Sequence, residues 1–483
     1  LSIWIAAEDM DPELMRMEPS LLNADSPFVA LHHEVVDWVA ARRQSIDFDD
    51  SHLQVMFDQC KALIIGLQKR GAVVGSSLNT AYLLERLSQT LERLETLMAI
   101  FVSNRYLPRR ILLLTGCFAR AAAERHSISR LWKQSSGLMA RSVTQNAGDH
   151  GEHYITRDKK EYWAMFYSAA GGGVLIALMA LFKIYLGSII DDKVWKGIAE
   201  GLNYGLGFMV IFMLHFTVAT KQPAMTAARF AEAVEKTPQG KSVNMKLAQL
   251  LVDVFRSQSI AVLGNVLIAM GLAALIAFGY QYKTGEPLMN AEQIAYQLHS
   301  IDPFAGTLWF AAIAGVWLFC SGIISGYFDN RSNYLNMRMR LTQHPLLKKL
   351  MSEKTRVKFA NYMHENYGSL IGNLCFGMLL GITGVVGYLT HLPLDIRHVA
   401  FSSANVGYIA VSGHFTYSLL LQCIGFVLLI GLVNLIVSFS LTLWVALRSL
   451  NAEIDSWWPI WHEVCQIVKK RPLSLFLPVQ LDK

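Results

Sequence analysis

The sequence predicts an all-α, polytopic membrane protein. Ser257–Tyr282 is a run of 26 residues without a charge, between Arg256 and Lys283. A helix of that length is longer than the ~30 Å thickness of a hydrocarbon core. The 483-residue chain is 53% hydrophobic and only 17% charged, whereas soluble proteins carry about 25% charged residues. Together with further apolar runs, these features predict six transmembrane helices that follow an N-terminal helical bundle domain.

The N-terminal part, residues 1–160, contains no apolar run long enough to span a membrane. Its patterns predict helices over Pro27–Arg43, over Leu53–Leu67 with a stop at Gly71, and over Leu78–Val102. Apolar side chains three and four residues apart mark the last of these, at Leu84, Leu87, Leu91, Leu94, Met98 and Phe101. This seam covers less than three heptads, so we expect packing inside a bundle and not a free dimerisation zipper.

A basic stretch lies within residues 105–141, where Glu124 is the sole acidic residue. Such a stretch can bind the phosphates of nucleic acid or of anionic lipid headgroups. Alternatively, it is a solvent-exposed helix face that binds neither. Because a predicted span follows soon after it, we favour lipid contact or a solvated face over DNA. The candidate phosphate-binding residues are Arg105, Arg109, Arg110, Arg120, Arg125, Arg130 and Lys133, with Arg141 beyond them.

The membrane domain is predicted over residues 161–447, with a 448–483 tail behind it. The expected spans are Trp163–Phe182, Gly201–Thr220, Ser257–Tyr282, Pro303–Phe328, Tyr367–Thr390 and about Ser418–Leu447. Loops 221–256 and 329–366 hold fourteen Lys and Arg residues, whereas the three other connections hold five. Positive loops stay in the cytoplasm. This charge bias therefore predicts that both basic loops and both termini are cytoplasmic.

An internal repeat is predicted inside this domain. Gly264-Asn265 and four further identities recur 108 residues later, starting at Gly372-Asn373. A fainter copy occurs in the first span, so we expect three tandem helical hairpins, each entering from the cytoplasm. Chance similarity between glycine-rich apolar helices is the alternative.

Two further segments suit a membrane interface. Val399–Thr416 is uncharged but rich in Ser, Gly and Asn, which favours a re-entrant or interfacial segment on the outer side. Ile454–Val468 carries three tryptophans and precedes a Lys-Lys-Arg run, as helices that lie at the membrane surface do.

The intramembrane polar candidates are His215, Asn265, Asn373 and Asn434. Polar groups are costly in lipid, so we expect the three asparagines to form hydrogen bonds to neighbouring helices. His215 lies within an apolar run, but no acidic partner lies in the predicted spans, so a proton relay is not expected.

A weak candidate metal site consists of His150, Glu152 and His153, just before the first span. A hydrophilic loop at the membrane surface is the alternative. The six cysteines are scattered and show neither a disulfide framework nor zinc-ligand spacing. Nucleotide-binding and hydrolase motifs are absent from the sequence, so no cofactor is predicted. The chain begins at Leu1 with an acidic stretch, and we expect it to be a fragment of a longer chain.

Four stretches carry a resemblance to a known family: GEHYITRDKKEYW (Gly151–Trp163), ATKQPAMTA (Ala219–Ala227), YFDNR (Tyr327–Arg331) and VSGHF (Val411–Phe415). The chain resembles a bacterial family of site-specific recombinase transmembrane proteins, over nearly its whole length. That resemblance implies a bacterial inner-membrane protein, and the family name implies DNA recombination. The residues do not supply that chemistry, because the sequence has no His-x-x-Arg and the N-terminal part reads as helical.

Three functions stay open from the sequence. The chain could act on or bind DNA through the 105–141 stretch. It could be a transport or envelope-maintenance protein whose hairpins enclose a path or a lipid groove. It could also be a scaffold that binds unknown protein partners through its N-terminal bundle.

Overall fold

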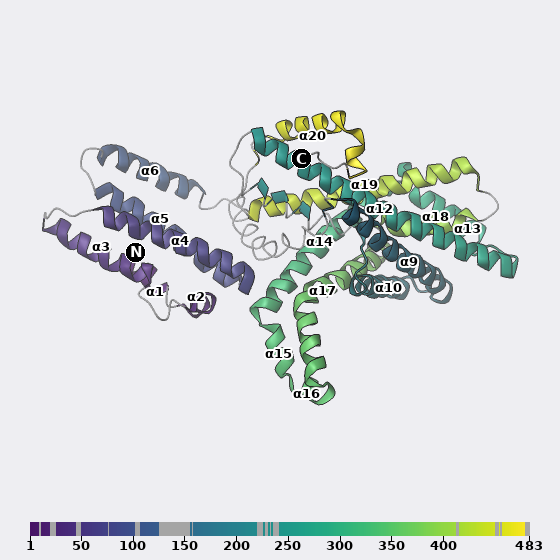
Figure 1. Ribbon diagram of the computed structural model, residues 1–483, viewed down its shortest axis with the longest axis horizontal. Coiled ribbons are helices and arrows are strands. Elements are labelled where there is room, and N and C mark those ends of the chain that lie inside the picture. Colours follow the sequence, from purple (N-terminus) through teal and green to yellow (C-terminus); the bar gives the residue numbers. More distant parts are fainter. Residues whose placement is uncertain are drawn as a thin grey trace. The chain divides into compact units, whose positions relative to one another are not determined.

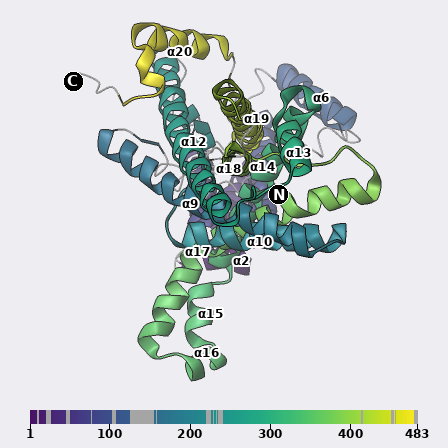
Figure 2. The same cartoon turned by 90° about the vertical axis from the view of Figure 1, so that its right-hand side faces the viewer.

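The computed structural model of the chain is helical throughout the part that it describes, with no strand there (Figures 1 and 2). The structure describes residues 1–8, 11–19, 26–44, 50–75, 77–101, 107–124, 155–156, 158–219, 226–227, 230–231, 233–234, 241–411, 415–449, 454 and 456–478. The helices form two compact units, Leu1–Ser142 with Asn330–His364, and Val143–Asp329 with Glu365–Lys483.

The first unit is a helical bundle built by the N-terminal part of the chain. Its helices are α1 (Ser2–Glu8), α2 (Pro12–Met17), α3 (Pro27–Arg43), α4 (Asp50–Val74), α5 (Leu78–Phe101) and α6 (Leu107–Glu124). The 330–364 segment adds α15 (Met337–Gln343) and α16 (Pro345–Leu350) to the same unit. The core of this unit includes the fully buried Phe28, Leu31, Phe57, Leu87 and Leu91.

Helices α3 and α5 confirm the sequence prediction. Pro27 occupies the first turn of α3, and the Ser26 hydroxyl accepts a hydrogen bond from the Phe28 amide at 3.1 Å. Such a cap satisfies one of the unpaired amides at a helix start. The α5 seam is buried as predicted, at Leu84, Leu87, Leu91, Leu94 and Met98. The side chain of Phe101 lies outside the described residues.

The predicted end of the second helix is wrong. Helix α4 continues through Gly71 and ends at Val74. The stop is Gly75, whose φ of +81° is in the left-handed region that glycine adopts without a steric penalty. The basic turn at Lys69 and Arg70 is therefore an exposed turn within the helix, where Arg70 forms an ion pair with Glu18, and not its last turn.

The second unit contains the apolar helices. They are α9 (Lys159–Ile189), α10 (Lys193–Met213), α12 (Lys241–Thr284), α13 (Ala291–Ile301), α14 (Thr307–Tyr334), α17 (Glu353–Thr390), α18 (Val399–Ala410), α19 (Tyr417–Ser449) and α20 (Trp458–Lys470), with the short helices η4 (Pro303–Ala305) and η5 (Pro472–Leu475). The last turn of α14 and the first turns of α17 belong to the first unit.

Five helices are long and apolar enough to cross a membrane. They are Lys159–Ile189, Asn244–Thr284, Thr307–Tyr334, Glu353–Thr390 and Tyr417–Arg448. Five of the six expected spans therefore coincide with such a helix, and the chain has the architecture of a membrane protein.

The second expected span differs from the prediction. Helix α10 ends at Met213, whereas a helix was expected up to Thr220. His215 has a φ of 58°, so the chain leaves the helical path, and the Thr217 amide then donates to the Ser168 carbonyl of α9 at 3.2 Å. The helix is also less apolar at its start, because it includes Lys193, Lys196 and Glu200.

Two glycines on each of α10 and α17 let these helices approach closely. A Cβ on Gly377 would collide with the backbone of Gly205, and one on Gly381 would collide with the backbone of Gly201. Small residues at such crossings are typical of helix packing in membranes. Gly377 and Gly381 are four residues apart on α17, and their partner is the Gly201 and Gly205 face of α10.

Candidate functional site

Helix α18 lies inside the second unit, among α9, α12 and α19, as the two views agree (Figures 1 and 2). Almost all of its residues are buried, including Ser402, Ser403 and Tyr408. Its 12 residues extend only about 18 Å, which is too short to cross a hydrocarbon core. The expected outer segment is therefore a helix buried within the bundle, because its small side chains permit close packing.

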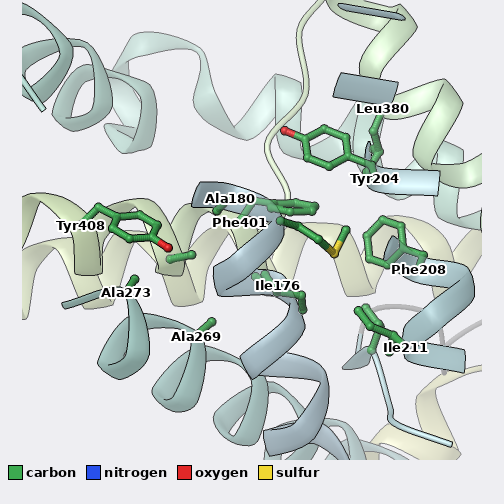
Figure 3. Close-up of a cluster of buried hydrophobic side chains, with 14 of the residues drawn as sticks. Ile176, Ala180, Tyr204, Phe208, Ile211, Ala269, Ala273, Leu380, Phe401 and Tyr408 are labelled. Carbon is green, nitrogen blue, oxygen red and sulfur yellow. The ribbon is translucent and has the colours of Figure 1, made fainter. Parts of the chain in front are cut away.

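Small residues and one buried hydroxyl fix α18 against its neighbours. A Cβ on Gly407 would lie 2.8 Å from the Ala273 side chain of α12. The Tyr408 hydroxyl donates to the Ala177 carbonyl of α9 at 2.7 Å. Figure 3 shows Tyr408 beside Ala273 at one end of the apolar cluster, whereas Phe401, from the first turn of α18, lies toward Tyr204 and Phe208. Close contact between the backbones at Gly407 and α12 thus fixes α18 on one side, and the hydrogen bond from Tyr408 to α9 fixes it on another.

The start of α18 lies among aromatic rings. The His398 ring precedes the helix and is 1% exposed. Its centroid lies 5.7 to 6.1 Å from those of Phe208, Phe376 and Phe401. Phe401 in turn lies 4.4 Å from the Tyr204 ring, and Figure 3 shows Tyr204 and Phe208 on the same side of the cluster. This aromatic group joins α18 to α10 and α17.

Asn434 fixes the same end of α18 from α19. Its Oδ1 accepts from the Val399 amide at 3.2 Å, and its Nδ2 donates to the carbonyls of Ala311 and Arg397 at 2.7 and 3.0 Å. Asn265 makes an equivalent set of bonds from α12. Its Oδ1 accepts from the Ala219 amide at 2.8 Å, and its Nδ2 donates to the carbonyls of Ala169 and Thr217. Both side-chain amides therefore form hydrogen bonds to a neighbouring helix and to a segment outside the long helices, as expected for these two of the three asparagines.

A charged pair lies near this end of the unit, between α9 and α10. Lys183 Nζ lies 3.2 Å from a carboxylate oxygen of Glu200 and 5.6 Å from the centre of the Tyr204 ring. The Glu200 side chain is 13% exposed and that of Lys183 is 38% exposed. The pair is therefore only partly buried, and water screens part of its attraction. It joins the last turns of α9 to the early turns of α10.

The connection that precedes α18 adds a second charged pair. Arg397 Nη1 lies 2.6 Å from an Asp395 carboxylate oxygen, and its Nε donates to the Ser300 carbonyl of α13 at 2.8 Å. Lys193 Nζ lies 4.4 Å from the ring centre of Tyr388, which is near the end of α17. The connections α9–α10, α12–α14 and α17–α18 therefore gather at one end of the unit, around the start of α18.

The structure separates the other residues proposed from the sequence. His215 is exposed, in the turn after α10, and not within an apolar helix as expected. Asn373 donates to the Ser369 carbonyl of its own helix at 2.7 Å. Arg109, Arg110 and Arg120 are on α6, and Arg109 is exposed. The remaining basic candidates Arg105, Arg125, Arg130 and Lys133, and the metal candidates His150, Glu152 and His153, lie outside the described residues. Within the described ranges no group of three or more potential metal ligands occurs.

Sequence reasoning missed the Lys183–Glu200 pair and His398. Lys183 was placed at the end of a span, and Glu200 one residue outside the next. The structure instead puts each of them inside a helix. The signal was present in the spacing of Gly197, Gly201 and Gly205, since three small residues four apart indicate a helix face in close contact. Because this glycine face begins at Gly197, the packed helix must begin before Glu200, and Glu200 lies within it.

Residues 1–478 match the model of a protein family described as "Site-specific recombinase". Comparisons with curated proteins and with solved structures give no match.

Proposed function

The chain belongs to the site-specific recombinase family, and we propose that this member is a bacterial inner-membrane protein whose membrane unit provides a path for a small polar solute. In this proposal the second unit carries out the transport. The observation that carries the proposal is the burial of α18, a helix too short to span, with charged pairs gathered at its start.

Helices that end inside a membrane unit are typical of transport sites. The backbone amides and carbonyls at such helix ends have no partner within the helix. At the depth of a membrane they are stable only where protein surrounds them or where they line a water-filled path. Ionisable side chains within membrane helices likewise mark substrate or ion pathways. Lys183 lies near the end of the apolar helix α9, and its partner Glu200 lies in the early turns of α10, where the pair faces the start of α18 through Tyr204 and Phe401. The combination supports transport more than simple anchoring.

The proposed topology has six spans in three hairpins, with α10 as the second span. Its 21 residues extend about 31 Å, close to the thickness of a hydrocarbon core. Three connections meet near α18. At the opposite end, the Thr156 hydroxyl is hydrogen-bonded to that of Ser257, in the interior of α12, and the Tyr162 hydroxyl near the start of α9 donates to the Phe476 carbonyl. Positive loops then put the first end outside and both termini in the cytoplasm.

The internal repeat stays part of this proposal. A Cβ on Gly264 would lie 2.8 Å from the Phe166 carbonyl oxygen of α9, and one on Gly372 would lie 3.0 Å from the Ser321 carbonyl oxygen of α14. Both glycines thus permit close approach to a preceding helix. The asparagines that follow these glycines have different partners: Asn265 donates to the Ala169 carbonyl of α9, whereas Asn373 donates to the Ser369 carbonyl of its own helix.

Strand exchange on DNA is not what we propose, although the family name refers to it. The sequence lacks His-x-x-Arg, and the α/β domain of serine recombinases has no counterpart among the described helices. DNA binding through the arginines of residues 105–133 is the competing reading, and the experiment below distinguishes it.

The experiment asks whether water reaches α18. In a full-length variant without native cysteines, Ser403→Cys is exposed to a small, charged thiol reagent in proteoliposomes. Ser438→Cys on α19 is the matched control, because both serines are 0% exposed. Ser188→Cys, at an exposed position, gives the upper rate. We expect Ser403→Cys to react at least tenfold faster than Ser438→Cys.

Equal rates at the two buried positions would overturn the transport proposal. If the same preparation also bound duplex DNA in a salt-dependent manner, and lost that binding with Arg109→Ala and Arg120→Ala, the DNA reading would replace it.

A further inference from the structure

Helix α6 presents large apolar side chains to solvent. Ile111, Leu112, Leu113 and Phe118 are 48%, 73%, 63% and 58% exposed. A helix in a soluble bundle normally covers such residues. The first unit therefore contains one helix whose apolar side chains the rest of the described unit leaves uncovered.

The order of residues in α6 gives it one continuous apolar face and a second side that carries arginines. Leu107, Ile111, Leu114 and Phe118 recur four, three and four positions apart, which places them on one face of an α-helix. Arg109 and Arg120 are eleven positions apart and lie on the opposite side, which also carries Leu112 and Leu113, whereas Arg110 flanks the apolar face. Glu124, the last residue of the helix, is its sole acidic residue. This is the pattern of a helix that lies in the plane of a membrane surface.

We propose that α6 binds the surface of an anionic lipid bilayer, with its Leu107–Phe118 face inserted among the lipid headgroups. Charge complementarity selects this occupant, because the second side carries arginines that attract anionic headgroups. The same chain supplies the membrane, since the first span-length helix begins at Lys159, 35 residues after Glu124. The proposal does not depend on transport by the second unit.

The test measures which face of α6 meets lipid. In the full-length protein without native cysteines, Phe118→Cys carries a polarity-sensitive fluorophore on the apolar face. Gly116→Cys carries it on the opposite face. Gly116 is a suitable control position, because nothing lies within 4 Å of the place its Cβ would occupy. Proteoliposomes contain phosphatidylcholine with 30% phosphatidylglycerol and a lipid whose acyl chain carries a quencher.

We expect the label at position 118 to be quenched at least threefold more than that at position 116. Quenching at position 118 should fall at least twofold in phosphatidylcholine alone, in high salt, or with Arg109→Glu and Arg120→Glu. Circular dichroism of the charge variant checks that helix content is retained.

Three results would overturn the proposal. Equal quenching at both positions would show that no face is selected. A blue shift at position 118 without lipid quenching, together with energy transfer between labelled copies, would assign the face to a second copy of the chain. A blue shift that required added duplex DNA would assign it to nucleic acid.

Discussion

The guanidinium of Arg16 lies 4.2 Å from the centre of the Tyr334 ring, and its Nη1 donates to the Tyr334 carbonyl at 2.7 Å. The Tyr334 hydroxyl in turn donates to Glu13 at 2.8 Å, and Arg16 Nη2 donates to the Gly75 carbonyl at 2.9 Å. Residues more than 300 positions apart in the sequence are thereby joined inside the first unit. Helix α2 and the end of α4 are both held at the start of the 330–364 segment.

Arg16→Ala should loosen this junction. Hydrogen bonds to a charged group contribute about 1.5–3 kcal/mol, and a cation–π contact about 0.5–1 kcal/mol at exposed sites. Since the site is partly solvated, we expect a loss of about 1–2 kcal/mol. Hydrogen exchange of the full-length protein should speed up for amides near Gly75 and Tyr334. Arg93→Ala, at an exposed position on α5, is the control and should change neither region. Unchanged exchange in Arg16→Ala would contradict the prediction.

Replacing Asn265 or Asn434 by Ala should destabilise the second unit. Each change leaves a buried amide and two carbonyl oxygens without these partners, at a cost of about 1–3 kcal/mol for each unsatisfied group, although membrane proteins recover part of this. We expect each variant to have a lower thermal unfolding midpoint in detergent. Leu275→Ala serves as the control on α12, because Leu275 is 69% exposed. An asparagine variant as stable as Leu275→Ala would disprove the structural role.

Much of the architecture follows from local sequence patterns, because it depends on local chemistry. The α5 seam, the Ser26-Pro27 helix start and the long apolar helices each reflect residues close together in the chain. The roles of Asn265 and Asn434 were also predictable, since lipid leaves a buried amide few alternatives. The hydrogen-bond partners of these asparagines could not be predicted, because the amides of Ala219 and Val399 come within reach only once the helices have packed.

The errors share a physical cause. Charge marks where a span can end, but it does not show whether two opposite charges will meet inside the bundle. Glu200 was therefore placed outside a span, and its pairing with Lys183 was not foreseen. The end of α10 was missed for a similar reason. The apolar residues after Met213 follow a turn and pack on α9, so hydropathy alone could not distinguish them from a continuing helix.

The contact between α10 and α17 depends on the absence of side-chain atoms at Gly377. Gly377→Ala should separate the helices and lower the unfolding midpoint strongly, because a Cβ there would meet the backbone of Gly205. Overpacking of this kind costs about 1–3 kcal/mol. Gly384→Ala on the same helix is a matched control, since nothing lies within 4 Å of its Cβ position. That control should be neutral or stabilising, by up to about 1 kcal/mol of helix propensity. Equal effects of the two substitutions would refute the close contact.

The proposed topology makes opposite predictions for two positions in the chain. A reporter fused after Glu292, at the start of α13, should score as periplasmic. One fused after Lys349, in α16, should score as cytoplasmic, because loop 329–366 carries eight basic residues. An in-frame fusion after Lys283 is a second outer position and should agree with Glu292. The reverse pattern would rule out the six-span arrangement.

Lys183 and Glu200 should act as one unit in a double-mutant cycle. Lys183→Met leaves the Glu200 carboxylate in an apolar helix pair without its counter-charge, and Glu200→Gln does the same to the Lys183 ammonium. Removing one charge leaves the other without its partner, and because Lys183 is 38% exposed, water screens part of that cost. The double variant should therefore be more stable than the sum of the single effects predicts, with a coupling free energy of about 0.5–3 kcal/mol. Thermal unfolding in detergent measures it, and Lys160→Met, at an exposed position on α9, is the control. Additive single effects would mean that the two charges do not stabilise each other, and the charged pair could then no longer support a path beside α18.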